Sequence, residues 1–421
     1  MIVGCSVVTD LITYVVPRGR APGSDGVGAR SGVPGGARRL DSCSNKCSND
    51  AVRWEKQRIT PPNSPSGEAG AAADIAGETA ELDLGVSPEA PRSGGHRIGA
   101  GLRLPEPVPI EAGTEDAYAI EIRAKSILNQ VPGESGVPFE WTLNPYRGCG
   151  HACRYCFARN THTYLDLDSG HDFDSKIVVK VNAGQLLRRE LANPKWRGHP
   201  VAMGTNTDPY QRAEGRYALM RDILTALTER ANPFSILTKS TLILRDLDLI
   251  ESAAAVTDVS IAVSIGSLDE GLWRTVEPGT PAPARRLEVV RRFAEAGIGC
   301  SVLLAPILPG LSDSWEHIDR TVGALVEAGA KSITPLPLHL RPGAREWYRA
   351  WLQREHPSLV PLYARLYRDS SYAPESYRRE VVELVERACR AHGMHRESSS
   401  GARDTPKRAA SETANEQLSL L

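Results

Sequence analysis

Short apolar runs alternate with helical stretches from about residue 139 to residue 340, and this alternation is the strongest constraint on the fold. The runs are nearly continuous in apolar residues, as strands buried on both faces are. Helices that join parallel strands cover both faces of a sheet, so the pattern predicts a parallel sheet with helices packed on it. The predicted strands are Phe139–Tyr146, His199–Thr205, Phe234–Lys239, Val259–Ile265, Gly299–Pro306 and Ser332–Leu340.

Six such units predict an α/β fold arranged as a partial (β/α)6 TIM-type barrel. In such a fold the loops that follow the strands converge at one edge of the sheet, and functional residues lie there. The residues directly after each predicted strand are therefore the first candidates for a site.

The chain of 421 residues is long enough for one large domain with appendages. Residues 1–115 are rich in Gly, Pro, Ala and Ser without a helical or strand period, which predicts a disordered extension. We expect the core at residues 116–340, a helical C-terminal cap at 341–395 and a flexible tail at 396–421. The sequence has no basic segment before its first apolar run and no apolar run long enough to span a bilayer, so we expect a cytoplasmic protein.

The charge balance gives no argument for a nucleic-acid partner. Fifty Lys and Arg stand against 51 Asp and Glu, which leaves a formal net charge of -1. Nucleic-acid-binding domains are usually basic, so bulk charge does not favour that class, although a local basic groove remains open.

Three of the eight cysteines fall within eight residues, at Cys149, Cys153 and Cys156, in the segment GCGHACRYCFAR. A structural zinc site or an electron-transfer [4Fe-4S] cluster uses four protein ligands, whereas three thiolates leave one iron of a [4Fe-4S] cluster open. The alternative is a zinc site that His151 or His162 completes. The spacing and the predicted fold favour the cluster.

The segment NPYRGCGHACRYCFAR resembles the radical S-adenosylmethionine (SAM) motif of the branch related to spore photoproduct lyase, also described as DNA repair photolyase-like. The resemblance extends over about Phe139 to Leu340. Its further blocks are GTNTDPYQRAEGRY (204–217), ILTKSTLILRDLDLI (236–250), AVSIGSLDE (262–270), EPGTPAPARRLEVV (277–290) and APILPGLSD (305–313). The segment VRWEKQ at Val52 is similar to the Met-Arg-Trp start of such proteins, which points to a translation start near residue 52.

The resemblance implies a radical SAM core with two cofactors, a [4Fe-4S] cluster on Cys149, Cys153 and Cys156 and SAM on its open iron. One electron from the cluster would break a C–S bond of SAM and release a 5'-deoxyadenosyl radical. By the same resemblance, the SAM-binding residues are polar groups at strand ends, with a lysine for the carboxylate. They are Thr205, Thr207, Lys239 and Ser264. The alternatives are that the two threonines only cap the end of their strand and that Lys239 is only a solvated side chain.

One departure from the resemblance concerns the hydrogen donor. Spore photoproduct lyases have a cysteine in the loop after the second strand, whereas the matching residues 204–208 contain none. Reversal of thymine dimers by the same route is therefore in doubt. Tyr155 and Tyr210 are candidate donors, and Cys300 and Cys389 are predicted to be packed in the core.

The chain ends in QLSLL, Gln417 to Leu421, which is similar to the pentapeptide that docks bacterial repair proteins on the sliding clamp. We therefore consider three functions: a radical SAM lyase acting on DNA lesions, radical modification of RNA, protein or a metabolite, and a clamp-tethered protein with a structural or sensory cluster. The first two require an electron donor such as flavodoxin or ferredoxin.

Overall fold

The structure is a computed structural model that describes residues 14–15, 108–109, 117–132 and 137–396. The predictions of a disordered 1–115 extension, a start near residue 52 and a clamp peptide at Gln417–Leu421 concern residues outside these ranges, apart from two short strands. Within the described ranges, no helix has the length and apolar character needed to cross a membrane.

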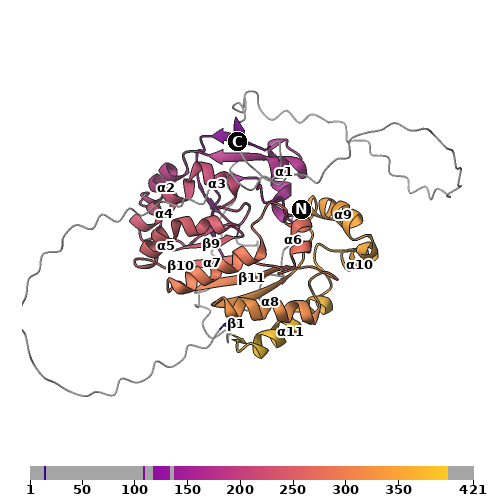
Figure 1. Cartoon of the computed structure of the whole chain (residues 1–421). Coiled ribbons are helices and arrows are strands. Elements are labelled where there is room, and N and C mark those ends of the chain that lie inside the picture. The colour runs from indigo at the N-terminus through magenta and orange to yellow at the C-terminus, as the bar shows by residue number, and fades with distance from the viewer. Residues whose placement is uncertain (1–13, 16–107, 110–116, 133–136, 397–421) are drawn as a thin grey trace, which may run out of the picture. The chain divides into compact units, whose positions relative to one another are not determined.

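A nine-stranded sheet lies at the centre of the fold, and six neighbouring strands of it run parallel (Figure 1). The parallel strands are β5 (Trp141–Leu143), β8 (Val201–Met203), β9 (Phe234–Thr238), β10 (Val259–Ser264), β11 (Cys300–Ile307) and β12 (Ser332–Pro337). The outer strands, which pair antiparallel, are β4 (Leu128–Gln130), β1 (Tyr14–Val15) and β13 (His395–Arg396). The order across the sheet is β13-β1-β12-β11-β10-β9-β8-β5-β4.

Each predicted strand is present, and the α/β class is confirmed. Five strands are shorter than their apolar runs, whereas β11 has the predicted length and begins one residue later. No strand pairing among the described residues joins the two outer edges of the sheet, so the sheet is open and the barrel description stays a prediction. The strand register determines which side chains meet at the edge of the sheet. Val263 of β10 lies beside Thr238 of β9. The next residues along these strands, Ser264 and Lys239, therefore end neighbouring strands at the same edge.

A row of helices packs along the sheet, each beside the next. The helices are α2 (Ala183–Leu191), α4 (Leu219–Glu229), α5 (Leu247–Ala254), α7 (Pro283–Glu295), α8 (Trp315–Glu327) and α11 (Glu375–Ala391). Helix α8 shows why these segments pack as they do: Ile318, Val322 and Leu325 recur at helical spacing, and all three are buried against the sheet.

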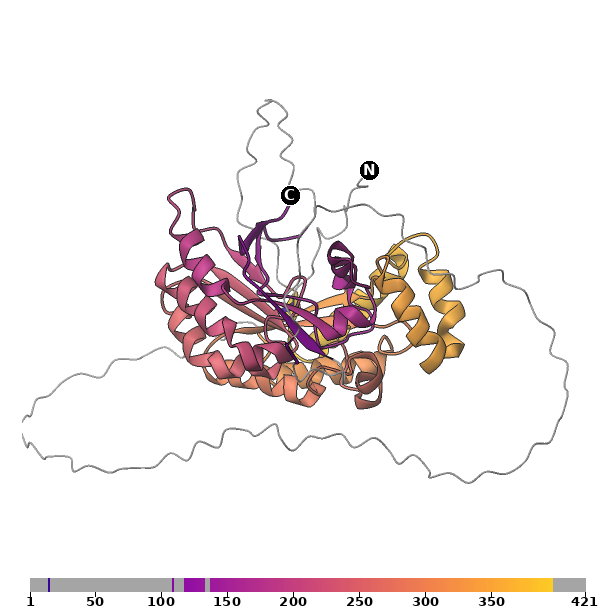
Figure 2. The same cartoon turned by 90° about the horizontal axis from the view of Figure 1, so that it is seen from above.

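A second apolar cluster lies beside the carboxyl ends of β11 and β12 and is built from leucines and four buried aromatic side chains. It joins α6 (Glu270–Val276) to α9 (Ala344–Glu355) and α10 (Val360–Leu366) through Tyr348, Trp351 and Tyr363. In Figure 2 the yellow-orange helices α9 and α10 stand on the side opposite the pink helices α4 and α5. Helix α11, by contrast, packs on α8 in the main core, so the helices of the 341–395 segment divide between two clusters. The boundary between a core and a single cap stays a prediction.

A second, four-stranded sheet carries the cysteine segment, and the sequence analysis did not predict it. Its strands, in spatial order, are β2 (Val108–Pro109), β3 (Tyr118–Ile122), β7 (Lys176–Lys180) and β6 (Tyr146–Arg147). Strands β6 and β7 pair antiparallel although 28 residues separate them in the sequence. The whole cysteine segment thus forms the long connection between two paired strands.

Gly204 directly follows β8 and can only be glycine, which leads to a stability prediction. Its φ is +89°, and a Cβ there would lie 1.9 Å from the carbonyl oxygen of Leu237. We expect Gly204→Ala to lower the free energy of unfolding by about 2 to 4 kcal/mol, because both backbone strain and a backbone clash are introduced. Chemical denaturation of the purified protein measures the change.

Gly198 is the matched control, since its φ is +69° but no atom lies within 4 Å of a built Cβ. Gly198→Ala should therefore show only the strain of a positive φ, about 1 kcal/mol. Equal losses in the two variants would contradict the close approach of Gly204 to β9.

Candidate functional site

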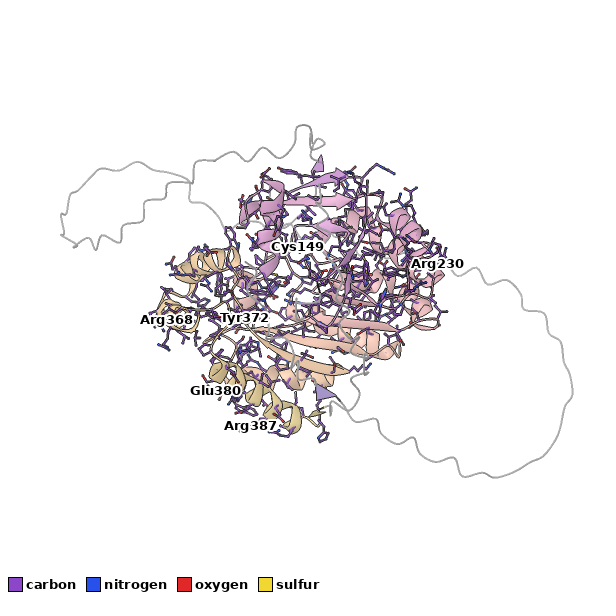
Figure 3. All side chains as sticks on the ribbon, turned by 180° about the vertical axis from the view of Figure 1, so that it is seen from behind. Cys149, Arg230, Arg368, Tyr372, Glu380 and Arg387 are labelled. Atoms are coloured by element: carbon purple, nitrogen blue, oxygen red, sulfur yellow. The ribbon has the colours of Figure 1, made fainter. Side chains whose placement is uncertain are left out.

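The three cysteines lie in a loop between β6 and β7 at the carboxyl edge of the parallel sheet, and Cys149 is labelled in Figure 3. Gly148 starts the loop with a φ of +83°, and the amide of Cys149 donates to the carbonyl oxygen of Phe173 at 3.0 Å. Cys149 and Cys153 are each 7% exposed, and Cys156 is partly exposed. The prediction that the motif follows the first strand at this edge agrees with the structure.

The three thiols are near enough to influence one another. Burial raises the pKa of the Cys149 thiol well above its usual range, and Asp208, Cys153 and Cys156 raise it further. Burial also raises the pKa of Cys153 to about 12. Three neighbouring buried thiolates need positive charge to be stable, and iron supplies it. The donor set therefore fits an iron-sulfur cluster.

The zinc alternative fits the geometry poorly. The Nε2 of His162 is engaged by the carbonyl oxygen of Lys176 at 2.9 Å. His151 is buried, and burial lowers its pKa to about 4, while its Nδ1 lies 3.4 Å from Asp208. Each histidine thus has a ring nitrogen engaged by another group, which favours the three thiols over a zinc site completed by histidine.

Gln211 and Asp208 hold the loop from the side of β8. Gln211 Nε2 donates to the carbonyl oxygen of Gly148 at 3.0 Å, and Gln211 Oε1 accepts from the amide of Gly150 at 3.0 Å. Asp208 Oδ2 accepts from the amide of Lys239 at 2.7 Å and faces His151. The carboxylate of Asp208 thus links the cysteine loop to the end of β9.

Arg159 holds the other end of the loop. This fully buried guanidinium donates to the carbonyl oxygen of Cys153 at 2.9 Å and to both carboxylate oxygens of Asp174, at 2.8 and 2.9 Å. It is stacked between two rings, 5.3 Å from the centroid of Phe173 and 4.9 Å from that of Trp347 on α9. A buried charge needs this degree of pairing, and the pair fixes the loop against α9.

A third set of contacts comes from the loop between α6 and α7. Glu277 accepts from the hydroxyl of Tyr155 and from Arg286 Nη2, the latter at 2.5 Å. Arg286 Nη1 also donates to the carbonyl oxygen of Ser264 at 3.0 Å. Gly279 brings the two loops together, because a Cβ there would lie 2.1 Å from the carbonyl oxygen of Gly150.

Lys239 and Ser264 meet at the carboxyl edge, as the register requires. Lys239 Nζ donates to Ser264 Oγ at 2.9 Å, and Ser264 Oγ donates to the carbonyl oxygen of Ala305 at 2.9 Å. Within the described part of the chain, Lys239 forms no ion pair with a carboxylate. Its charge nevertheless acts on the thiols: burial raises the pKa of Cys156, while Arg159 and Lys239 lower it.

The two predicted threonines have polar partners. Thr205 Oγ1 donates to Asn144 Oδ1 at 3.2 Å and remains partly exposed. Thr207 is buried, and its hydroxyl donates to the carbonyl oxygen of Gly148 at 2.6 Å and accepts from Gln211. The role predicted for Thr207 toward SAM stays untested, and the structure gives its hydroxyl a place in holding the cysteine loop.

Tyr155 and Tyr210 differ as hydrogen donors. Tyr210 is fully buried in the main core, which argues against its contacting a substrate. Tyr155 is partly exposed beside two of the cysteines. Cys300 and Cys389 are packed in the core as predicted.

The sequence analysis missed the buried ion pairs around the loop, Arg159 with Asp174 and Arg286 with Glu277. Arg159 stands three residues after Cys156, within the same quoted motif, so its position was a usable signal. Glu277 and Arg286 likewise lie in one quoted block, EPGTPAPARRLEVV, whereas Asp174 lies outside every quoted block, and no local pattern marks it as buried.

Comparisons with known proteins agree with this geometry. The model of the "Radical SAM superfamily" matches residues 143–322. An uncharacterized protein of Mycobacterium tuberculosis is 53% identical over 265 residues, which cover 63% of this chain and 78% of that protein. The chain belongs to the radical SAM superfamily. An uncharacterized protein of Methanocaldococcus jannaschii is 31% identical over 204 residues, 48% of this chain and 72% of that protein.

Among solved structures, a spore photoproduct lyase mutant with bound SAM and dinucleoside spore photoproduct matches with a TM-score of 0.48 and 14% identity, over 65% of this chain and 78% of that one. The SAM-bound SuiB of Streptococcus suis matches with a TM-score of 0.34 and 18% identity, over 53% and 47%.

As a radical SAM enzyme, the protein uses a [4Fe-4S] cluster and SAM. The residues at the carboxyl edge fit both cofactors, with three neighbouring thiols for the cluster and, beside them, a lysine that forms no ion pair with a carboxylate among the described residues. The assignment of individual side chains to the two cofactors is a proposal.

Gln211 offers a test of how the cysteine loop is held. In Gln211→Glu the two donations from Nε2 are lost, and a carboxylate oxygen faces the carbonyl oxygen of Gly148. We expect iron and sulfide bound after anaerobic reconstitution to fall at least about threefold, because a buried unpaired charge displaces the loop. Metal analysis and the visible absorbance of the cluster measure the loss.

Gln185→Glu makes the same chemical change on an exposed position of α2 and should bind iron as the wild type does. Unchanged iron content in Gln211→Glu would show that the Gln211 contacts do not position the loop.

Proposed function

We propose that the reduced protein cleaves SAM with a [4Fe-4S] cluster bound by Cys149, Cys153 and Cys156. The cluster and SAM, when bound, supply one electron and a 5'-deoxyadenosyl radical, the chemistry characteristic of the superfamily. The chain's own residues hold these groups, orient SAM and exclude water. A site in the reducing cytoplasm suits such a cluster.

The observation that carries this proposal is the position of Lys239. Its ammonium ends β9, bonds only to the hydroxyl of Ser264 among the described side chains, and acts electrostatically on Cys153 and Cys156. A cation beside three thiols is where the carboxylate of an amino acid ligand would be neutralised. SAM carries such a carboxylate, and Lys239 can bind it without breaking an existing ion pair.

We assign Ser264 and Thr205 to the remaining polar groups of SAM. Ser264 lies against Lys239, and Thr205 stands at the end of β8, one strand from Lys239. The hydroxyls of both side chains can accept as well as donate, which suits the amino group and the ribose of SAM. Thr207 acts as a positioning residue for the cysteine loop, because its hydroxyl is used by Gly148.

DNA is the substrate class that we propose to test first. The support is the similarity of the blocks between Phe139 and Leu340 to the spore photoproduct lyase branch, together with the clamp-like peptide Gln417–Leu421. Residues 204–208 contain no thiol, and Tyr155 is the tyrosine nearest to the cysteines in sequence. Modification of RNA, protein or a metabolite is the alternative, since fold and cofactor do not determine the substrate.

The reaction is tested by comparing the wild type with the triple variant Cys149→Ala, Cys153→Ala, Cys156→Ala. Reconstituted under anaerobic conditions, reduced with dithionite and given SAM, the wild type should release 5'-deoxyadenosine and the variant none. The same assay with a UV-irradiated oligonucleotide should show faster release if DNA is the substrate. A spectroscopically intact cluster in the wild type that releases no 5'-deoxyadenosine would instead identify a structural or sensory cluster.

The assignment of Lys239 has its own test. Lys239→Met keeps the aliphatic length and removes the charge, so we expect the KM for SAM to rise about tenfold or more at unchanged cluster content. Lys331→Met, an exposed position at the opposite edge of the sheet, is the matched control. An unchanged KM would exclude Lys239 as the partner of the SAM carboxylate.

A further inference from the structure

We propose that the surface around Phe157 is the docking site of an acidic one-electron carrier protein. This surface, here named the Phe157 rim, is defined by Arg154, Phe157, His339, Arg341, Trp347 and Arg354. The inference rests on the proposed function, because a radical SAM enzyme must receive an electron from another protein. It adds the place where that protein binds.

Phe157 gives the rim its apolar anchor. The large hydrophobic side chains exposed in the described part of the chain are Phe157 (37%), Tyr164 (75%) and Val256 (54%). Phe157 and Tyr164 both belong to η3 (Phe157–Leu165), the 3-10 helix that begins directly after Cys156. Because so few large hydrophobic side chains are exposed, an exposed aromatic ring among them indicates a contact surface rather than a chance exposure.

The guanidinium of Arg341 lies against this anchor, 5.5 Å from the centroid of the Phe157 ring. The His339 ring lies 5.7 Å from the same centroid, but burial lowers the pKa of His339 to about 4, so it adds an aromatic face and no charge. A second guanidinium, that of Arg154, lies 5.7 Å from the centroid of the Trp347 ring. Burial is the main cause of the lowered pKa of Arg154; the carboxylate of Asp174 opposes this shift, and the like charges of Arg159 and Arg354 add to it.

Two guanidinium groups of the rim have no carboxylate partner. Arg354 is paired with its neighbour Glu355 at 2.8 Å, and Asp174 is paired with Arg159. Arg341 and Arg154 form no ion pair with a carboxylate among the described residues. The rim therefore carries the unpaired charges of Arg154 and Arg341 on a chain whose formal charge is -1.

The rim lies against the cysteine loop. Arg154 follows Cys153 and Phe157 follows Cys156 in the sequence, so the rim includes the loop's own residues. Behind it, Trp347 stacks on Arg159, which donates to the carbonyl oxygen of Cys153. A carrier bound here would dock beside the loop that carries the cysteines.

The occupant that this surface fits is an acidic protein. Arginine and aromatic side chains with few carboxylates are typical of protein-binding centres, and positive charge steers an acidic partner to them. Single-stranded nucleic acid would instead stack its bases on a free aromatic face. The Phe157 ring has Arg341 and His339 within 6 Å of its centroid and is only 37% exposed, so little of a face is free.

The transfer itself balances simply. The carrier, a reduced flavin protein or a reduced iron-sulfur protein, is oxidised by one electron, and the enzyme's cluster is reduced by one electron. No atom is transferred and no further reactant is required. Interfaces of this kind are small and depend on salt.

The experiment measures binding and reduction separately, with a purified acidic flavodoxin as the probe. In the double variant Arg341→Glu, Arg354→Glu we expect the dissociation constant for flavodoxin, measured by calorimetry, to rise about tenfold or more. Cluster reduction by reduced flavodoxin should slow in parallel, while 5'-deoxyadenosine release with dithionite stays at the wild-type level. Added salt should weaken wild-type binding and affect the variant less.

The control is the double variant Arg230→Glu, Arg292→Glu, which makes the same charge change at two exposed positions, one directly after α4 and one in α7. Figure 3 shows Arg230 on the side of the molecule away from Tyr372, and Arg230 follows α4, at the opposite edge of the sheet from the cysteine loop. This control should bind flavodoxin as the wild type does.

Two results would overturn the inference. One is a rim variant that binds flavodoxin and is reduced by it as the wild type is; the other is loss of oligonucleotide binding with flavodoxin binding intact, which would make the rim a nucleic-acid surface. If wild type with dithionite releases no 5'-deoxyadenosine, the proposed function fails, yet the binding measurement still decides the rim.

Discussion

Three neighbouring thiols in one loop, two buried and one partly exposed, cannot all ionise unless positive charge is brought to them, and this constraint organises the site. Burial raises the pKa of each thiol, so the protonated form is favoured without a counter-charge. Lys239 and Arg159 both lower the pKa of Cys156 and so act in the opposite direction. The protein's own cations provide part of the compensation, and we propose that the iron of the cluster supplies the rest.

Holding such a loop rigid requires contacts from several elements, and the fold provides them from three directions. Gln211 bonds it from the β8 side, Arg159 from within its own excursion, and Gly279 allows the loop before α7 to lie against it. Each of these groups is buried and has its hydrogen bonds satisfied by backbone or by a paired charge. Preorganisation of this kind leaves the open edge of the sheet free for SAM.

The sequence was sufficient to predict the six parallel strands and the cysteine motif, because apolar runs and ligand spacing are local signals. It was not sufficient for the antiparallel pairing of β6 with β7, which joins strands far apart in the chain. It also could not show that Thr207 turns its hydroxyl to Gly148 while Thr205 stays partly exposed, because both follow the same strand. The division of the C-terminal helices between two clusters likewise depends on packing that no local pattern records.

The contact of Trp347 with Arg159 has a consequence for the order in which the enzyme matures. The ring that covers Arg159 comes from α9, nearly two hundred residues after the guanidinium that it covers. During synthesis the cysteine loop emerges long before this part of its wall exists. Until α9 docks, the buried pair of Arg159 with Asp174 is open to water on one side, and the loop lacks its final support. The support of the cysteine loop is therefore complete only once the C-terminal helices have docked. A chain truncated before α9 keeps the whole cysteine motif but lacks the Trp347 ring that covers Arg159.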